Sequence, residues 1–208
     1  MEVAVVDYGA GNLRSVTRAL AAAGGAPRLV RAPEGLAGAR LVVVPGVGAF
    51  APAMRRLHAA GLVDALRAVA RSGTPLLGLC LGMQLLFDES DEGGQVTEGL
   101  GILRGVVRRL PPGVKVPHMG WNTLEIDRPG PLVAGLPDPA YVYFVHSYVV
   151  RPADRAVVVA WSTHGERFPA IVRAGSIFGF QFHPEKSSRL GARLLGNLLA
   201  GLRARVAP

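Results

Sequence analysis

The chain has 208 residues, half of them hydrophobic, which predicts a single domain over residues 1–208 with a substantial buried core. Its formal net charge is +8, but the basic residues are scattered rather than gathered in blocks, which argues against nucleic-acid binding. The single cysteine excludes an internal disulfide. With no secretory signal and no apolar run of about 20 residues, we expect a cytoplasmic protein without a membrane span.

The first half of the chain alternates short apolar runs with helical stretches. We predict buried strands at residues 3–6, 41–44 and 76–79, and helices that begin after Asn12 and that cover residues 52–71 and 82–87. Asn12 is suited to cap the first of these helices. Continuous apolar strands separated by helices are typical of a parallel sheet covered on both faces.

The second half is richer in strand candidates at short intervals, which favours antiparallel hairpins. These candidates are residues 102–110, 141–150, 156–161, 170–173 and 177–182, followed by a helix over residues 188–205. The sequence therefore predicts an α/β fold, in which a mostly parallel central sheet flanked by helices is extended by antiparallel strands.

A cysteine between glycines lies where the third predicted strand meets the next helix. The segment from Gly78 to Gly82 reads G-L-C-L-G, with Cys80 at its centre. This is the pattern of a nucleophile elbow, a strained turn that pushes a nucleophile out of the sheet, and we expect its glycines to prevent clashes with a substrate. The helix N-terminus favours a thiolate, and the N–H of Leu81 is suited to bind an oxyanion. Cys80 is therefore the candidate nucleophile.

A histidine and a glutamate follow the last predicted strand, in the segment F-H-P-E from Phe182. His183 and Glu185 are two residues apart, so in an extended segment their side chains face the same side. A cysteine nucleophile needs a base that holds its proton and returns it to the leaving amine, and that base needs a group to orient it. We assign these roles to His183 and Glu185.

Neither a nucleotide cofactor nor a metal is predicted. The turn Gly9-Ala10-Gly11 follows a strand, but the dinucleotide-binding fingerprint needs a third glycine where this chain has Arg14, and there is no G-K-S or G-K-T phosphate loop. The remaining histidines form no grouping that resembles a zinc site. We expect His58 and His164 at the surface. His118 and His146 have no carboxylate at a useful spacing after them.

Together, the elbow and the H-P-E segment resemble the class I, or triad, glutamine amidotransferases, in which the cysteine is followed by His-x-Glu near the C-terminus. The resemblance covers essentially the whole chain and shows no departure at the triad. Within that family, five segments are similar to those of the glutaminase subunits of imidazole glycerol phosphate synthase, in histidine biosynthesis: D-Y-G-A-G-N from Asp7, P-G-V-G-A-F from Pro45, K-V-P-H-M-G-W-N from Lys115, F-V-H-S-Y from Phe144 and F-H-P-E-K-S from Phe182. The resemblance implies a flavodoxin-like fold and ammonia release from glutamine without a cofactor.

The resemblance also implies roles for residues outside the triad. N–H groups near Gly48, in the P-G-V-G segment, would complete the oxyanion hole with Leu81, and the two glycines would make a peptide flip inexpensive. The ammonium group of glutamine would pair with a carboxylate, and its amino-acid end would be held by polar groups nearby. The residues implied for this binding are Glu92 for the ammonium, and Gln84 with the backbone of Ser147 and Tyr148 for the amino-acid end.

A cyclase subunit is the partner that the resemblance implies, in a heterodimer that passes ammonia between its subunits. The docking face would include Asn12, Trp121, Tyr143 and Lys186. Without the resemblance these residues would be a helix cap, two core aromatics and a surface lysine.

Three other functions remain open from the sequence. Another triad amidotransferase, supplying purine, pyridoxal or anthranilate synthesis, would keep the triad but lack the pair of P-G-V-G and M-G-W-N segments. A thiol hydrolase or peptidase would share the elbow and would not need a docking face. A basic binding module would have no catalytic activity. Glutaminase assays with Cys80→Ala as the control separate this last function from the enzymes, and reconstitution with a cyclase separates the amidotransferases from one another.

Overall fold

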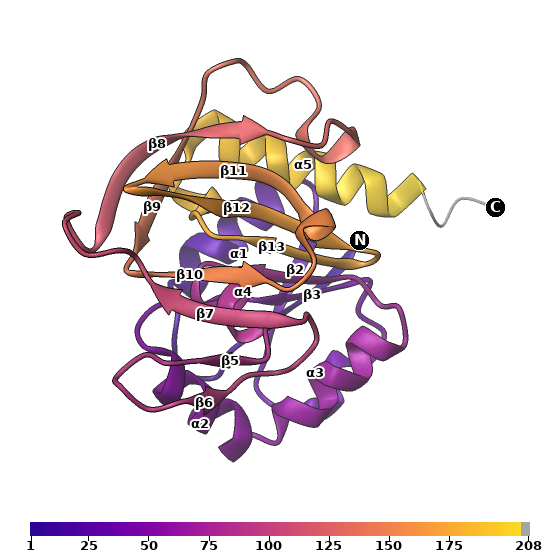
Figure 1. The fold of residues 1–208 in the computed structure, drawn as a ribbon. Helices are drawn as coiled ribbons and strands as arrows, with labels where there is room; N and C mark the ends of the chain where they lie inside the picture. The colour runs from indigo at the N-terminus through magenta and orange to yellow at the C-terminus, as the bar shows by residue number, and fades with distance from the viewer. Residues whose placement is uncertain (205–208) are drawn as a thin grey trace.

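A parallel sheet forms the centre of the computed structural model, which describes residues 1–204 (Figure 1). Four of its strands come from the first half of the chain and a fifth comes from near the end. They are β1 (Glu2–Val6), β2 (Ala26–Val30), β3 (Leu41–Val44), β4 (Leu76–Leu79) and β13 (Ile177–Phe180), in the order β2-β1-β3-β4-β13. The predicted α/β fold is confirmed.

Helices cover both faces of this sheet, because its strands are apolar on both sides. Val3 and Val5 share one core with α1 (Leu13–Ala22) and α5 (Ser188–Ala204). Ala4 and Val6 belong to the opposite core, with α2 (Phe50–Ala59) and α3 (Leu62–Arg71), and Figure 1 shows the two helix layers on either side of the strands. None of the helices within residues 1–204 is long and apolar enough to cross a membrane. The predicted end of the last helix, at residue 205, lies outside the described residues.

The single helix predicted for residues 52–71 is wrong. The structure has two helices there, α2 and α3, separated by Gly61, whose φ of 67° is left-handed. Buried leucines continue across the break at positions 57, 62 and 66, so the hydrophobic pattern alone does not reveal it. The helix predicted for residues 82–87 is α4 (Leu81–Leu85), which begins directly after Cys80.

Antiparallel strands extend the sheet beyond β13, as predicted. The added strands are β12 (Glu166–Ala174), β11 (Val158–His164), β8 (His118–Ile126) and β9 (Ala140–His146), in that order. A smaller sheet contains β10 (Tyr148–Pro152), β7 (Gly105–Arg109), β5 (Glu89–Ser90) and β6 (Thr97–Glu98). Short 3₁₀ helices lie at Pro33–Leu36, Pro131–Val133, Arg155–Val157 and Pro184–Lys186.

The strand predicted for residues 141–150 is in fact two strands. β9 pairs with β8 in the large sheet, whereas β10 pairs with β7 in the small one, so Ser147 lies at a corner between the sheets. The strand predicted for residues 156–161 begins as a 3₁₀ turn, and β11 continues to His164. β2 and β8 were not predicted, because both mix exposed and buried residues without regular alternation.

Candidate active site

The predicted site residues lie where the carboxyl ends of the parallel strands meet. β4 leads into Cys80, β3 leads into the segment from Pro45 to Gly48, and β13 leads toward His183. The carboxyl edge of an open parallel sheet is the usual location of a ligand site in α/β folds. The topology therefore brings Cys80 together with His183, which lies 103 residues later in the sequence.

The elbow at Cys80 is a strained turn. Cys80 has φ 52° and ψ −110°, a left-handed backbone that non-glycine residues rarely adopt. A Cβ on Gly82 would lie 1.8 Å from the carbonyl oxygen of Val44, and one on Gly78 would lie 2.5 Å from that of Gly82. The glycines are therefore required by the protein's own backbone packing, not by a substrate as the sequence argument expected.

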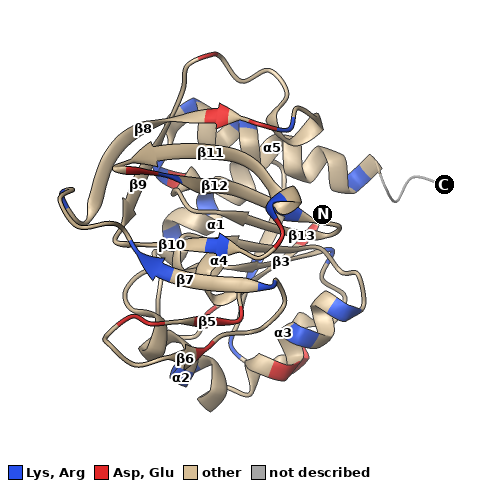
Figure 2. Ribbon diagram, viewed as in Figure 1, with Lys and Arg blue, Asp and Glu red and all other residues tan. Residues whose placement is uncertain are grey.

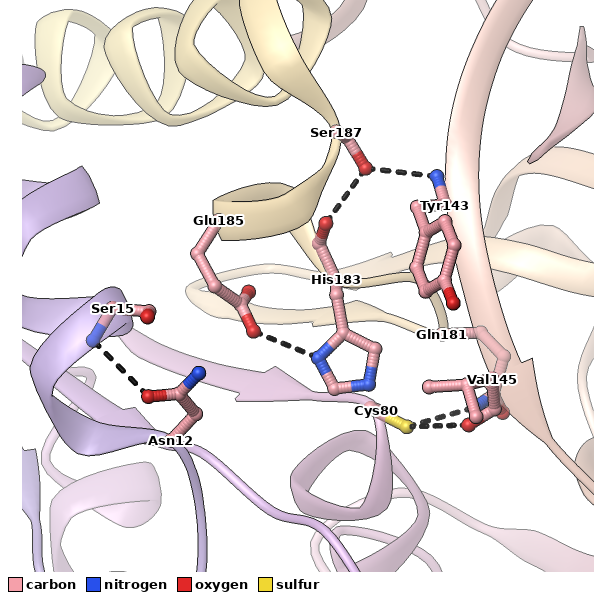
Figure 3. A network of polar contacts seen from close by, with 9 residues as sticks. All are labelled: Asn12, Ser15, Cys80, Tyr143, Val145, Gln181, His183, Glu185 and Ser187. Carbon is pink, nitrogen blue, oxygen red and sulfur yellow. Dashed lines mark hydrogen bonds and ion pairs between the residues drawn. The ribbon is translucent and has the colours of Figure 1, made fainter. Parts of the chain in front are cut away.

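His183 and Glu185 form a buried pair. Their Nδ1 and Oε1 atoms are 2.8 Å apart, and their side chains are 4% and 2% exposed. Because a carboxylate only accepts, Nδ1 carries the proton, and the ring turns its other edge toward the sulfur of Cys80 (Figure 3). Burial alone would lower the pKa of His183, but the neighbouring thiol of Cys80 and the carboxylate of Glu185 outweigh it and raise that pKa to about 10.

Strand β9 holds the backbone of His183 in place. The His183 N–H donates to the Tyr143 carbonyl at 3.0 Å, and the Tyr143 N–H donates to the Ser187 hydroxyl at 2.9 Å. The same hydroxyl donates to the His183 carbonyl at 2.6 Å, and Figure 3 shows both contacts of this hydroxyl. The sequence analysis gave Ser187 no role, and a serine four residues after a histidine is too common to have signalled one.

A cavity of about 380 Å³ opens in front of Cys80, a size suited to a small polar ligand. All of the residues assigned to the nucleophile, the base, the oxyanion hole and glutamine binding line it, except Glu185, which lies behind His183. These lining residues are Gly48, Cys80, Leu81, Gln84, Glu92, Ser147, Tyr148 and His183. The structure thus gathers one site from the predicted residues.

Gln181 is a site residue that the sequence analysis missed. Its side chain is fully buried, and its Nε2 donates to the Cys80 sulfur at 3.8 Å. Its Oε1 accepts from Gln84 Nε2 at 3.2 Å. The signal was present, since Gln181 precedes His183 by two residues in an extended segment and so shares its side.

Glu92, in the loop between β5 and β6, contacts the start of the helix that follows the Pro45–Gly48 segment. Its Oε2 accepts from the N–H of Phe50, the first residue of α2, at 2.6 Å. One carboxylate oxygen therefore satisfies a free amide of the helix N-terminus, two residues after Gly48. Glu92 also lines the cavity in front of Cys80.

Three of the four expected docking residues lie together. Trp121 and Tyr143 are cross-strand partners in β8 and β9, with ring centroids 6.0 Å apart, and the ammonium of Lys186 lies 5.7 Å from the Tyr143 ring. Trp121 is 52% exposed, so it is not the core aromatic of the alternative interpretation. Asn12 caps α1 by accepting from the Ser15 N–H, as predicted, and it lines a small cavity beside His183 and Glu185.

The remaining charged residues and histidines are spread over several elements within residues 1–204. Figure 2 shows Lys and Arg in separate segments of β7, β10, α3 and α5, with acidic segments between them, in agreement with the scattered charge of the sequence. Within residues 1–204, no three His, Cys, Asp or Glu side chains are grouped to hold a metal. His58 is exposed, as expected, but the expectation for His164 is wrong, because this half-buried residue ends β11 and its ring stacks on His118.

Comparison with known proteins decides the family. The model of the family "Glutamine amidotransferase class-I" matches residues 4–200. The chain belongs to this family. Among curated relatives of this amidotransferase, the imidazole glycerol phosphate synthase subunit HisH of Moorella thermoacetica is 51% identical over 195 residues, covering 94% of this chain and 92% of the relative. The subunit of the same name from Geobacillus kaustophilus is 50% identical over 202 residues, covering 94% of each chain.

Solved structures show the same fold. A crystal structure of a glutamine amidotransferase superposes with a TM-score of 0.76 at 27% identity, covering 97% of this chain and 98% of the other. The structure of PurLQS from Thermotoga maritima gives the same TM-score at 21% identity, covering the same shares, and supports the fold alone. The family resemblance carried by the elbow and the H-P-E segment is confirmed.

Proposed function

We propose that this chain is the glutaminase subunit of an imidazole glycerol phosphate synthase and releases ammonia from glutamine through a thioester on Cys80. The observation that carries the proposal is a strained cysteine elbow that opens into a polar cavity and faces a buried His183–Glu185 pair. The similarity to HisH subunits over 94% of the chain supports the choice of synthase.

The first half of the reaction begins with a proton on His183. The raised pKa of His183, which the thiol and carboxylate neighbours cause, favours an imidazolium at neutral pH, and the reaction needs Cys80 as the thiolate, the nucleophilic form of cysteine. The sulfur of Cys80 attacks the amide carbon of glutamine, and the resulting oxyanion accepts hydrogen bonds from N–H groups of Leu81 and the Gly48 region. The imidazolium gives its proton to the leaving nitrogen, the C–N bond breaks, and ammonia departs from the thioester.

The second half restores the enzyme. Neutral His183 takes a proton from water, and the hydroxide attacks the thioester carbon. The C–S bond then breaks, which releases glutamate and returns Cys80 as a thiolate beside the imidazolium. Glu185 keeps Nδ1 as the donor throughout, so that Nε2 always serves the reacting atoms.

Hydrogen bonds within the protein determine which groups in the cavity can still bind glutamine. Both N–H groups of Gln84 are engaged, one by the Tyr148 carbonyl at 2.9 Å and one by Gln181 Oε1 at 3.2 Å. Gln84 therefore offers only its oxygen, which suits the ammonium of glutamine, alongside the carboxylate of Glu92. The backbone at Ser147 would then meet the amino-acid end.

Ammonia must reach its acceptor unprotonated, because ammonium has no lone pair with which to attack. A shielded route into a partner meets this need, and the exposed side chains of Met119 and Trp121, 62% and 52% exposed beside Tyr143 and Lys186, supply a face of the kind that docks a protein. The cyclase subunit of the same synthase is the proposed partner.

Reconstitution tests this function. The chain is mixed with the cyclase subunit, and glutamate and imidazole glycerol phosphate are measured with glutamine and the ribonucleotide substrate present. We expect both products to form in equal amounts, and the synthase subunits that partner other amidotransferases to give no such coupling. Glutamine hydrolysis that responds instead to a purine, pyridoxal or anthranilate synthase subunit would contradict the choice of synthase.

Glu185→Gln is expected to lower turnover by about 10⁴-fold, less than loss of the nucleophile, because the base remains but loses its orienting carboxylate. The pKa of His183 should also fall, since one of the groups that raises it is gone. Because the folded pKa is raised, the imidazolium stabilises the wild-type fold fully below pH 6.5, and this contribution is lost as the pH rises through about 10. In the variant, the alkaline limit of kcat/KM and of stability should therefore move to lower pH.

The measurement is the pH profile of turnover and of thermal unfolding for both proteins, with an NMR titration of His183. A correctly folded variant with an unchanged alkaline limit would contradict the proposed role of Glu185.

A further inference from the structure

Three histidines outside the triad lie side by side at one wall of the glutamine cavity, which His146 itself lines. His118 in β8 and His146 at the end of β9 are cross-strand partners, both buried, with His118 Nδ1 3.0 Å from His146 Nε2. The ring of His164, from β11, stacks on His118 with centroids 4.2 Å apart. The reaction described above uses none of them.

The direction of the hydrogen bonds in this cluster is determined by its two ends. His146 Nδ1 lies 3.0 Å from the Tyr148 carbonyl oxygen, which only accepts, so Nδ1 carries a proton. In a neutral ring His146 Nε2 is then an acceptor, and His118 Nδ1 donates to it. His118 Nε2 in turn accepts from Asn122 Nδ2 at 3.2 Å, and that amide also donates to the Thr163 carbonyl at 2.8 Å.

Both rings must stay neutral for this row of hydrogen bonds to exist, because an added proton would point one N–H group at another. Burial lowers the pKa of His118 to about 4, and the stacked His164 contributes. Burial also lowers the pKa of His146 to about 3, with His118 as the next cause. The hydrogen bonds therefore all point the same way at neutral pH, from Asn122 through His118 and His146 to Tyr148, and neither ring is charged.

This row of hydrogen bonds ends at Tyr148, next to the corner where β9 leaves the large sheet and β10 enters the small one. The Tyr148 carbonyl accepts from His146 and also from Gln84 Nε2 at 2.9 Å, so both of its acceptor sites are used. The bond from His146 spans Ser147, whose backbone lines the cavity. The orientation of the wall that meets glutamine thus depends on the histidine pair.

We propose that His118 and His146 are positioning residues of the glutaminase, which hold the Ser147–Tyr148 wall in the shape that binds glutamine. The inference rests on the proposed function, since it concerns the glutamine site. It also connects that site to the expected docking face, because His118 precedes the exposed Met119 in β8.

The test compares histidine variants in the full-length chain saturated with the cyclase subunit. His118→Phe keeps a ring but removes the donor to His146, and we expect KM for glutamine to rise about five- to tenfold, as for loss of one ordinary hydrogen bond, with kcat within about twofold. His118→Asn keeps an N–H near the Nδ1 position and should recover most of the affinity. The matched control is His164→Phe, which keeps a ring stacked on His118 and removes a hydrogen bond to the Lys115 carbonyl, outside the bonds that join His118, His146 and Tyr148; it should leave KM unchanged.

A second measurement needs no activity. Nitrogen-15 NMR of labelled histidines should find His118 and His146 neutral at pH 7 with the proton on Nδ1 in both. A proton on His146 Nε2, or a KM for His118→Phe equal to that of His164→Phe, would overturn the positioning role while the glutaminase assignment stands. Absence of any Cys80-dependent glutamine hydrolysis in the wild-type complex would instead overturn the proposed function, and the positioning role with it.

Discussion

Cys80→Ala is expected to abolish synthesis from glutamine while synthesis from added ammonia continues. The lost rate should be on the order of 10⁶-fold, as when the nucleophile of a triad that acts as a unit is removed. The reason is that Cys80 is the only cysteine and the side chain toward which His183 turns (Figure 3). Alanine occupies the same strained backbone as cysteine, so the elbow needs no new conformation. The measurement is formation of imidazole glycerol phosphate in the reconstituted complex, first with glutamine and then with an ammonium salt at alkaline pH.

The ammonia-dependent rate is the internal control, because it requires a folded, docked subunit and an intact cyclase but no nucleophile. A second control is Cys80→Ser, which keeps a weak nucleophile of similar size and should be nearly as inactive, since the hydroxyl is far less acidic than a thiol. Glutamine-dependent turnover close to wild type in either variant would remove Cys80 from the mechanism. Parallel loss of both activities would show instead that the substitution had damaged the complex.

The isolated subunit is expected to be a poor glutaminase, because its oxyanion hole depends on the Pro45–Gly48 segment. The first half of this segment is held by contacts with the rest of the protein, whereas the second half can change its backbone conformation. The Pro45 carbonyl accepts from the buried Tyr8 hydroxyl at 2.8 Å, and a Cβ on Gly46 would lie 2.7 Å from the Gly82 nitrogen. Beyond that point Val47 is 43% exposed, and Gly48 has φ 96° with open space around its α-carbon. The peptide between these last two residues can therefore turn either its carbonyl or its N–H toward Cys80.

Docking of the cyclase is expected to raise glutamine turnover by about a hundred- to a thousandfold. This factor is the value of one oxyanion-hole donor, roughly 3–4 kcal/mol of barrier, and it should appear mainly in kcat. Such gating would prevent waste of glutamine when no acceptor is bound. The measurement is glutamate release by the isolated chain and by the complex saturated with the acceptor or an analogue. An isolated chain that already works at the full rate would mean that there is no gate.

Gly48→Ala separates the gate from simple docking. An added Cβ at this position meets nothing within 4 Å, so the substitution acts through backbone conformation rather than through a clash. We expect the variant to bind the cyclase normally and to show a much smaller ratio of docked to free turnover. An unchanged ratio would assign the activation to another part of the site.

The central sheet and the reactive segments could be predicted from the amino-acid pattern alone. Strands such as Leu41–Val44 are apolar at every position, which only a sheet buried on both faces satisfies, so their type and direction could be predicted. The elbow at Cys80 and the H-P-E segment were readable because each is local. His183 and Glu185 do pair as predicted, but Glu185 reaches the histidine from the 3₁₀ helix Pro184–Lys186 and not through the extended segment that was expected. The order of the elbow and the H-P-E segment along the chain also identified the family.

The points where strands change pairing partners, and the contacts between distant side chains, could not be predicted and follow from the folded arrangement. Residues 141–150 form one apolar run, yet the chain leaves one sheet for another at Ser147, because the pairing partner changes from β8 to β7. His118 and His146 are 28 residues apart and come into contact only through the register of β8 and β9. The hydroxyl of Ser187 likewise gains its task only when β9 packs beside His183. Such contacts depend on long-range pairing, which local periodicity does not encode.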